Sequence, residues 1–196
     1  MSDGHTELRV DETIMAEMQS IRLTDVDLGV GWLLDIGGGG EGIIGMAAGS
    51  RVVSIDLRRA ELAEVSNEAL KLTMDAREMA FLDGSFPTAA SFFTFMYIQT
   101  ADHAKVLGEV FRVLRPGGRL LVWDVNLPAT PGPGKKTFVL PLVIELPDGR
   151  TAPTMYGVGL KDLNLARLTA AAEAVGFRAA RSEESGATFF LELVKP

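Results

Sequence analysis

A run of five glycines in six residues, at positions 37–42, limits what this chain can fold into more than any other feature. An apolar segment, 31–36, leads into the run, and a second apolar segment, 43–48, follows it. Glycines permit a tight turn and let a ligand approach the backbone closely. The pattern predicts a strand, a loop and a short helix, with a ligand bound where the strand ends.

The first two thirds of the chain alternate between short apolar segments and amphipathic ones. Leu107, Val110, Phe111 and Leu114 recur at helical spacing, and Asp102 stands where a helix cap is expected. Strands alternating with helices imply parallel pairing with right-handed crossovers. We expect strands at 31–36, 51–56, 71–75, 89–95 and 120–125, and helices at 43–48, 58–70 and 103–114. The spacing of Ile14, Met15, Met18 and Ile21 predicts a further amphipathic helix at the start of the chain.

The last third has a different pattern. Two apolar segments, 137–145 and 150–158, flank Pro147-Asp148-Gly149, which is typical of a β-hairpin. A helix at 162–175 and strands at 178–183 and 187–194 close the chain. The sequence therefore predicts one α/β domain spanning 1–196. Its doubly wound, mostly parallel seven-stranded sheet would have helices on both faces, an antiparallel strand near the C-terminus and an inserted hairpin at 137–158.

Composition narrows the function classes. The formal net charge of −7 does not favour binding to nucleic acid or to an anionic membrane. The absence of cysteine excludes disulfides, thiolate metal sites and a cysteine nucleophile, and two distant histidines, His5 and His103, make a poor metal site. The start of the chain is too polar for a secretory signal, so we expect a cytoplasmic protein that binds a small molecule and no metal.

The glycine loop has two interpretations. Gly37, Gly39 and Gly42 have the spacing of a nicotinamide-dinucleotide loop, and Asp56 lies at about the right distance to bind a ribose. Asp35, immediately before the loop, would repel a pyrophosphate. A carboxylate in that position suits a cationic amino group, such as the amino-acid end of S-adenosylmethionine.

With these residues in place, the sequence resembles the class I methyltransferase family, which has a Rossmann-like fold and uses S-adenosylmethionine. The resemblance runs from Trp32 to Val125 and includes the segments 34–39, 81–86 and 109–118. Glu41 and Pro87 depart from it, since the family often has glycine and aspartate there. The resemblance implies cofactor contacts from Asp35, Gly37, Gly38, Gly39, Asp56, Leu57, Asp75, Ala76, Phe93 and Thr94.

The methyl acceptor is not specified by this pattern, although a small molecule is expected. Methyl transfer from a sulfonium needs alignment more than a dedicated base, and the candidates for a catalytic role are Tyr97, His103 and Tyr156. The hairpin at 137–158 could line the acceptor pocket, with Phe138, Leu140 and Tyr156 as its walls, or form a homodimer contact. An NAD(P)-dependent oxidoreductase and a non-catalytic partner subunit of the same fold are the alternative functions.

Overall fold

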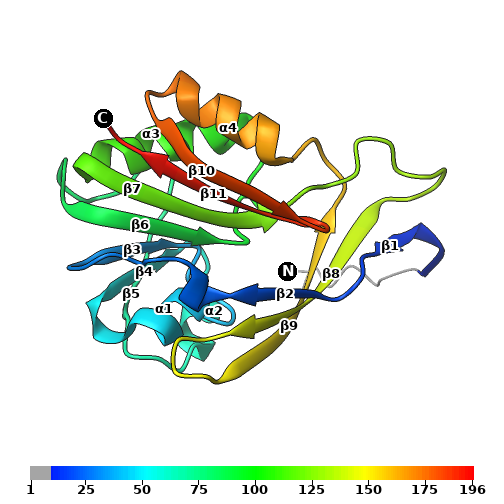
Figure 1. Cartoon of the computed structure of the whole chain (residues 1–196), viewed down its shortest axis with the longest axis horizontal. Helices are drawn as coiled ribbons and strands as arrows, with labels where there is room; N and C mark the ends of the chain where they lie inside the picture. Colours follow the sequence, from blue (N-terminus) through cyan, green and yellow to red (C-terminus); the bar gives the residue numbers. More distant parts are fainter. Residues whose placement is uncertain (1–9) are drawn as a thin grey trace.

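The computed structural model describes residues 10–196, and its largest element is a seven-stranded sheet (Figure 1). The strand order is β10-β11-β7-β6-β3-β4-β5. Five strands are parallel, and β11 runs antiparallel to both of its neighbours, which confirms the predicted fold class. The bounds are β3 Leu33–Ile36, β4 Val52–Asp56, β5 Leu70–Thr73, β6 Phe86–Phe92, β7 Leu114–Val125, β10 Arg178–Ser185 and β11 Thr188–Val194.

Two of the four α-helices, α3 (His103–Val113) and α4 (Leu165–Ala174), cover one face of this sheet (Figure 1). They bury Val110 and Leu168 against Leu120 and Leu191, all fully or almost fully inaccessible to solvent. The other helices are short: α1 is Ile43–Ala48 and α2 is Arg59–Glu64, with single 3₁₀ turns at Val10–Glu12, Leu23–Asp25, Gly49–Arg51 and Thr100–Asp102. None of the helices described is long and apolar enough to cross a bilayer.

The helix predicted over 58–70 is wrong in its second half, because α2 ends at Glu64. Asn67 explains the stop. Its Nδ2 donates to the carbonyl of Gly42 at 3.0 Å and its Oδ1 accepts from the amide of Ala69 at 3.1 Å. Such side-chain bonds to the backbone compete with helix formation.

A second, four-stranded sheet consists of β1 (Thr13–Met15), β2 (Gln19–Arg22), β8 (Thr137–Glu145) and β9 (Thr151–Gly159). The predicted hairpin is confirmed, with β9 antiparallel to the whole of β8. The predicted N-terminal helix is wrong: β1 and β2 pair in parallel with successive halves of β8. Side chains of β2 alternate between half-buried and exposed, which is the periodicity of a strand.

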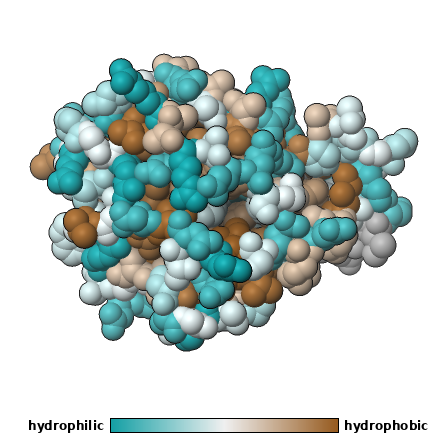
Figure 2. All heavy atoms as spheres, viewed as in Figure 1, coloured by the Kyte–Doolittle hydropathy of each residue, from teal (hydrophilic) through white to brown (hydrophobic). Residues whose placement is uncertain are grey.

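The second sheet packs on the face of the main sheet opposite to α3 and α4. One core cluster joins Leu140 and Leu142 of β8 to Leu121 and Trp123 of β7, together with Ile44 of α1. The sequence predicts that helices cover this face as well. In the structure, α1 and the second sheet cover it instead. Full burial of a leucine side chain contributes about 2 kcal/mol, so this contact holds the two sheets firmly together. Hydrophilic residues cover most of the surface seen in Figure 2, with apolar ones scattered among them.

Candidate functional site

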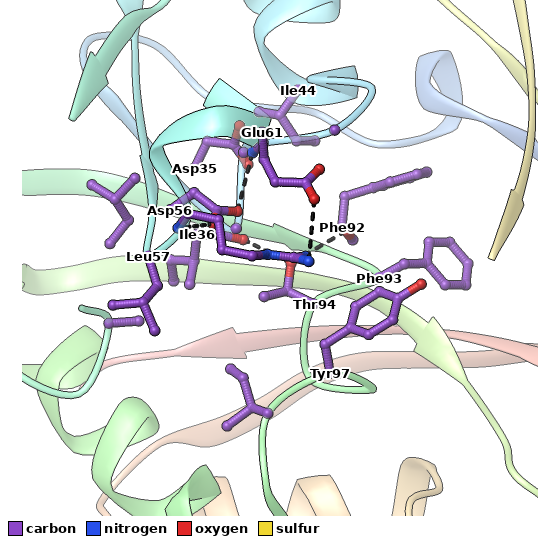
Figure 3. A pocket seen from close by; sticks show the side chains of 18 of the residues that line it. Asp35, Ile36, Ile44, Asp56, Leu57, Glu61, Phe92, Phe93, Thr94 and Tyr97 are labelled. Atoms are coloured by element: carbon purple, nitrogen blue, oxygen red, sulfur yellow. Dashed lines mark hydrogen bonds and ion pairs between the residues drawn. The ribbon is translucent and has the colours of Figure 1, made fainter. Parts of the chain in front are cut away.

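A cavity of about 890 Å³ opens at the carboxyl ends of β3, β4, β5 and β6. Ligands of doubly wound folds bind at this edge of the sheet, and the volume suits a small-molecule site. Figure 3 shows Asp35 and Asp56 on one side of the cavity and Phe93 and Tyr97 on the other. Every residue that the sequence suggests as a cofactor contact lines this cavity.

The glycine loop forms the floor of the cavity. The amides of Gly37 and Gly38 both donate to the carbonyl of Ile55, at 2.8 and 3.0 Å, so the loop folds back on β4. Gly37 has a φ of 74°, which favours glycine. A Cβ at Gly38 would overlap the carboxylate of Asp35. Bare backbone at these positions lets the loop lie directly on the acidic strand ends.

Asp35 is almost fully buried beneath this loop, with 2% of its surface exposed. Burial raises the pKa of its carboxyl group to about 7, against the opposing effect of a hydrogen bond from the Ser54 hydroxyl. That hydroxyl donates to Oδ2 at 2.9 Å. A carboxylate held in such a place gains stability from a cationic partner, such as an ammonium group.

Asp56 ends β4 and fixes the turn that follows. Its Oδ1 accepts from the amide of Arg58 at 2.8 Å, and its Oδ2 accepts from the amide of Gly39 at 3.3 Å. Each carboxylate oxygen keeps a further lone pair, and Asp56 and Leu57 both face the cavity. The carboxylate is therefore held rigidly enough to accept two hydroxyl groups of a ribose.

Asp75 and Ala76 follow β5 and line the next part of the cavity. The Arg77 guanidinium forms a bidentate ion pair with Asp75, in which Nε donates to Oδ1 at 3.0 Å and Nη2 donates to Oδ2 at 2.8 Å. Hydrogen bonds from Arg77 hold the pKa of Asp75 below its usual value. Arg77 also binds Asp102 at 2.9 Å, and the Asp102 side chain does not cap α3, contrary to the expectation from the sequence.

Phe93 and Thr94 form a sharp turn after β6, which ends at Phe92 and not at Phe95 as predicted. Phe93 has a φ of 51°, a left-handed conformation that is rare for a bulky residue. The Thr94 hydroxyl donates to the carbonyl of Ile36 at 2.9 Å and so ties the turn to β3. A strained turn of this kind often marks a functional site.

The three catalytic candidates do not lie together. Tyr97 and Tyr156 line the cavity, whereas His103 does not. His103 is 4% exposed, and its Nε2 lies 3.1 Å from the carbonyl of Phe95 and 3.2 Å from that of Ile98. Burial lowers its pKa, and Lys161 donates to the carbonyl of Ile98 at 2.6 Å. His103 therefore packs beneath the segment after β6 and does not line the cavity, which does not favour an acceptor-facing role.

Of the three hairpin residues expected to wall an acceptor pocket, only Tyr156 lines the cavity. Tyr156 and Met155 line the cavity, but Phe138 and Leu140 are buried in the core between the two sheets. His5 lies outside the described residues. Within them, no cluster of three or more acidic or histidine side chains could hold a metal ion.

Sequence reasoning missed Glu41 as a site residue. One of its oxygens accepts from the Tyr156 hydroxyl at 3.2 Å, and the other accepts from the Thr154 hydroxyl. Glu41 therefore connects the glycine loop to β9. The only signal in the sequence is the departure from glycine at this position.

Comparison with known proteins agrees with this geometry. Residues 34–122 match the model of a methyltransferase domain. The chain is 36% identical over 101 residues to a demethylmenaquinone methyltransferase of Thermus thermophilus, covering 52% of this chain and 42% of that protein. It is 28% identical over 108 residues to a sterol 4-C-methyltransferase of Caenorhabditis elegans, covering 55% and 32%. The chain thus spans less than half the length of either curated relative.

A solved structure of a methyltransferase from Methanosarcina mazei has the same fold, with a TM-score of 0.62 at 17% identity over 83% of this chain and 91% of that one. The fold and the acidic glycine-loop cavity define a Rossmann-like α/β protein with a candidate small-molecule site at the carboxyl ends of its parallel strands. The family match makes the class specific over the matched segment: residues 34–122 are similar to the methyltransferase domain family. The methyl donor of this family is S-adenosylmethionine.

Proposed function

We propose that this protein transfers the methyl group of S-adenosylmethionine to a small-molecule acceptor. The observation that carries the proposal is the placement of Asp35 and Asp56 on either side of the glycine loop, both facing one cavity. Asp35 suits the ammonium group of the methionine end, and Asp56 suits the two ribose hydroxyls. Asp75 and Ala76 line the neighbouring part of the cavity, where a carboxylate and a backbone amide suit the edge of an adenine.

The same placement argues against a nicotinamide dinucleotide. The two arginines in the cavity are both engaged, Arg58 with Glu61 at 3.1 Å and Arg77 with Asp75 and Asp102. A pyrophosphate on the glycine loop would therefore lie over the buried carboxylate of Asp35, with no unpaired arginine in the cavity to balance its charge. An ammonium group has the opposite preference.

We propose that the residues of this chain act by binding and alignment. S-adenosylmethionine supplies a methyl group already activated on a sulfonium. The glycine loop and Asp56 hold the cofactor, and the turn at Phe93 and Thr94 separates the cofactor half of the cavity from the acceptor half. Tyr156 and Met155 of the hairpin wall the acceptor half, where alignment of two bound reactants can supply much of the rate enhancement.

The first test is cofactor affinity, measured by calorimetry with S-adenosylhomocysteine. Asp56→Ala should weaken binding by about 2 kcal/mol, or about thirtyfold, because hydrogen bonds to a charged group are lost. Asp56→Asn, which keeps one acceptor oxygen, should lose less. Thermal unfolding of each free variant controls for damage to the loop. An unchanged dissociation constant in a folded Asp56→Ala protein would contradict the proposal.

A further inference from the structure

The acceptor half of the cavity has a carboxylate at its mouth. Glu41 extends from the glycine loop to β9, where hydroxyls of Tyr156 and Thr154 donate to its two oxygens. No ion pair of Glu41 occurs within residues 10–196. The contact holds this solvent-exposed carboxylate at the point where the loop meets β9, and among the described residues no lysine or arginine forms an ion pair with it.

Aromatic rings surround the same space. Phe93 stacks on Tyr156, with ring centroids 5.1 Å apart and planes inclined by 27°. Tyr97 enters from the turn after β6, and in Figure 3 its ring lies beside that of Phe93. Met155 completes the apolar lining. Three aromatic rings therefore border one part of the cavity.

The tyrosine hydroxyls stay protonated in this setting. Burial, followed by the negative charge of Glu41, raises the pKa of Tyr97 to about 12 and raises the pKa of Tyr156 further. The negative charge of Glu41 is thus felt at both rings. Neither phenol would supply a second negative charge or act as a base near neutral pH.

The rest of the cavity is acidic too. Six carboxyl groups and two arginines line it, and both arginines are paired with carboxylates within the cavity. The carboxyl groups belong to Asp35, Glu41, Asp56, Glu61, Asp75 and Asp102. Five of these lie at the strand ends and in the cofactor half, which leaves Glu41 as the carboxylate beside the aromatic rings.

We propose, resting on the function proposed above, that the acceptor is an amine carried on an apolar body, which is methylated on nitrogen, with Glu41 and the rings of Phe93, Tyr97 and Tyr156 as its binding site. A carboxylate and aromatic faces both attract an ammonium group, and the attraction grows when water is excluded. They repel a carboxylate or phosphate acceptor. An uncharged alcohol gains nothing from the charge.

The same groups favour the reaction as well as binding. The bound ammonium group first loses a proton to water. The free-base nitrogen then donates its lone pair to the methyl carbon, and the carbon–sulfur bond breaks with its electron pair remaining on sulfur. Positive charge thereby moves from sulfur to nitrogen. If the methylated nitrogen still bears a proton, it releases that proton to water. Glu41 and the ring faces lie where that charge develops, so they stabilise it in the transition state.

The experiment uses the full chain saturated with S-adenosylhomocysteine and three probes of similar shape: 2-phenylethylamine, 2-phenylethanol and 3-phenylpropanoate. Calorimetry at pH 7.5 should show the amine binding about tenfold more tightly than the alcohol, with the acid weakest. Glu41→Gln should remove most of the preference for the amine, leave alcohol binding unchanged and alter the affinity for S-adenosylhomocysteine by less than about twofold. In Glu41→Gln, the turnover of 2-phenylethylamine with S-adenosylmethionine should fall together with the affinity for the amine.

A matched control is Glu64→Gln, which removes the same charge from an exposed position on α2 outside the cavity and should leave all three probes unaffected. Equal or tighter binding of the alcohol or the acid would overturn the amine proposal, as would an amine preference that survives Glu41→Gln. Loss of S-adenosylhomocysteine binding in Glu41→Gln would instead assign Glu41 to the cofactor and also overturn it. Failure of the unmodified protein to bind S-adenosylhomocysteine would refute the methyltransferase proposal itself, so the two failures are distinguishable.

Discussion

The two halves of the cavity are built in different ways. The proposed cofactor half consists of strand ends and turns of the main sheet, all within the segment 35–106. The proposed acceptor half takes Met155 and Tyr156 from a second sheet, whose strands lie within residues 13–22 and 137–159. The packing that positions Met155 and Tyr156 is thus separate from the loops and strand ends that carry Asp35 and Asp56.

Leu140→Ala should have the largest effect of the variants considered, and it tests whether packing of the second sheet affects the proposed cofactor site. Leu140 is fully buried between the two sheets, so the variant should lower the free energy of unfolding by about 3 kcal/mol. Urea unfolding should remain a single transition, because one core cluster joins both sheets. The affinity of the folded variant for S-adenosylhomocysteine should change by less than about twofold, as expected if packing and cofactor contacts are separate.

Leu191→Ala, at an equally buried position on the face covered by α3 and α4, is the matched control and should cost a similar amount. Two separate unfolding transitions in Leu140→Ala would show that the second sheet is an independent unit, contrary to the prediction of one domain.

The cofactor half should respond to pH through Asp35. Because burial places its pKa at about 7, the carboxyl group is mostly protonated at pH 6 and mostly ionised at pH 8. Only the ionised form attracts an ammonium group, so the affinity for S-adenosylhomocysteine should increase about tenfold between these pH values. Calorimetry across this range measures the effect. A curve that is equally steep in Asp35→Asn would assign the titration to another group.

The smallest effect is expected at the link between the halves. Tyr156→Phe removes the hydroxyl that donates to Glu41 at 3.2 Å and should lower the free energy of unfolding by about 1 kcal/mol. The stack on Phe93 is retained, and cofactor affinity should not change. Tyr97→Phe is the comparison variant: it removes a hydroxyl that bonds the backbone of Gly157 instead of Glu41, so it separates loss of the Glu41 contact from loss of a tyrosine hydroxyl in general. A large drop in cofactor affinity in Tyr156→Phe would mean that the two halves are coupled through the loop.

The proposed cofactor half could be predicted from the sequence because the patterns that indicate it lie within short segments of the chain. The helix at Ile43–Ala48 and the strand ends at Asp35 and Asp56 follow from an apolar run, a glycine loop and an acid in order. The strand at Thr137–Glu145 was also predicted with its bounds, since Pro147-Asp148-Gly149 marks its turn.

The second sheet, which walls the proposed acceptor half, could not be predicted in the same way. Residues 14–21 have apolar spacing that fits a helix, but their structure depends on an edge of β8 far away in the chain. Strand formation depends on its neighbours more than helix formation does. The direction of Phe138 and Leu140 likewise depends on which sheet lies beneath them, and the contact of Glu41 depends on where β9 passes.

The pairing of β1 and β2 with β8 also affects the order in which the protein can assemble during synthesis. Glu12 and Lys136, whose side chains form an ion pair of 2.7 Å, are separated by 124 positions. Contacts between such distant segments form slowly, and the N-terminal part of a chain leaves the ribosome first. The first two strands must therefore wait without a partner while the glycine loop and the first strands of the main sheet are translated. A nascent chain halted before residue 137 would carry the glycine loop and the acidic strand ends but not Met155 and Tyr156, so the cavity would lack the wall that the second sheet contributes.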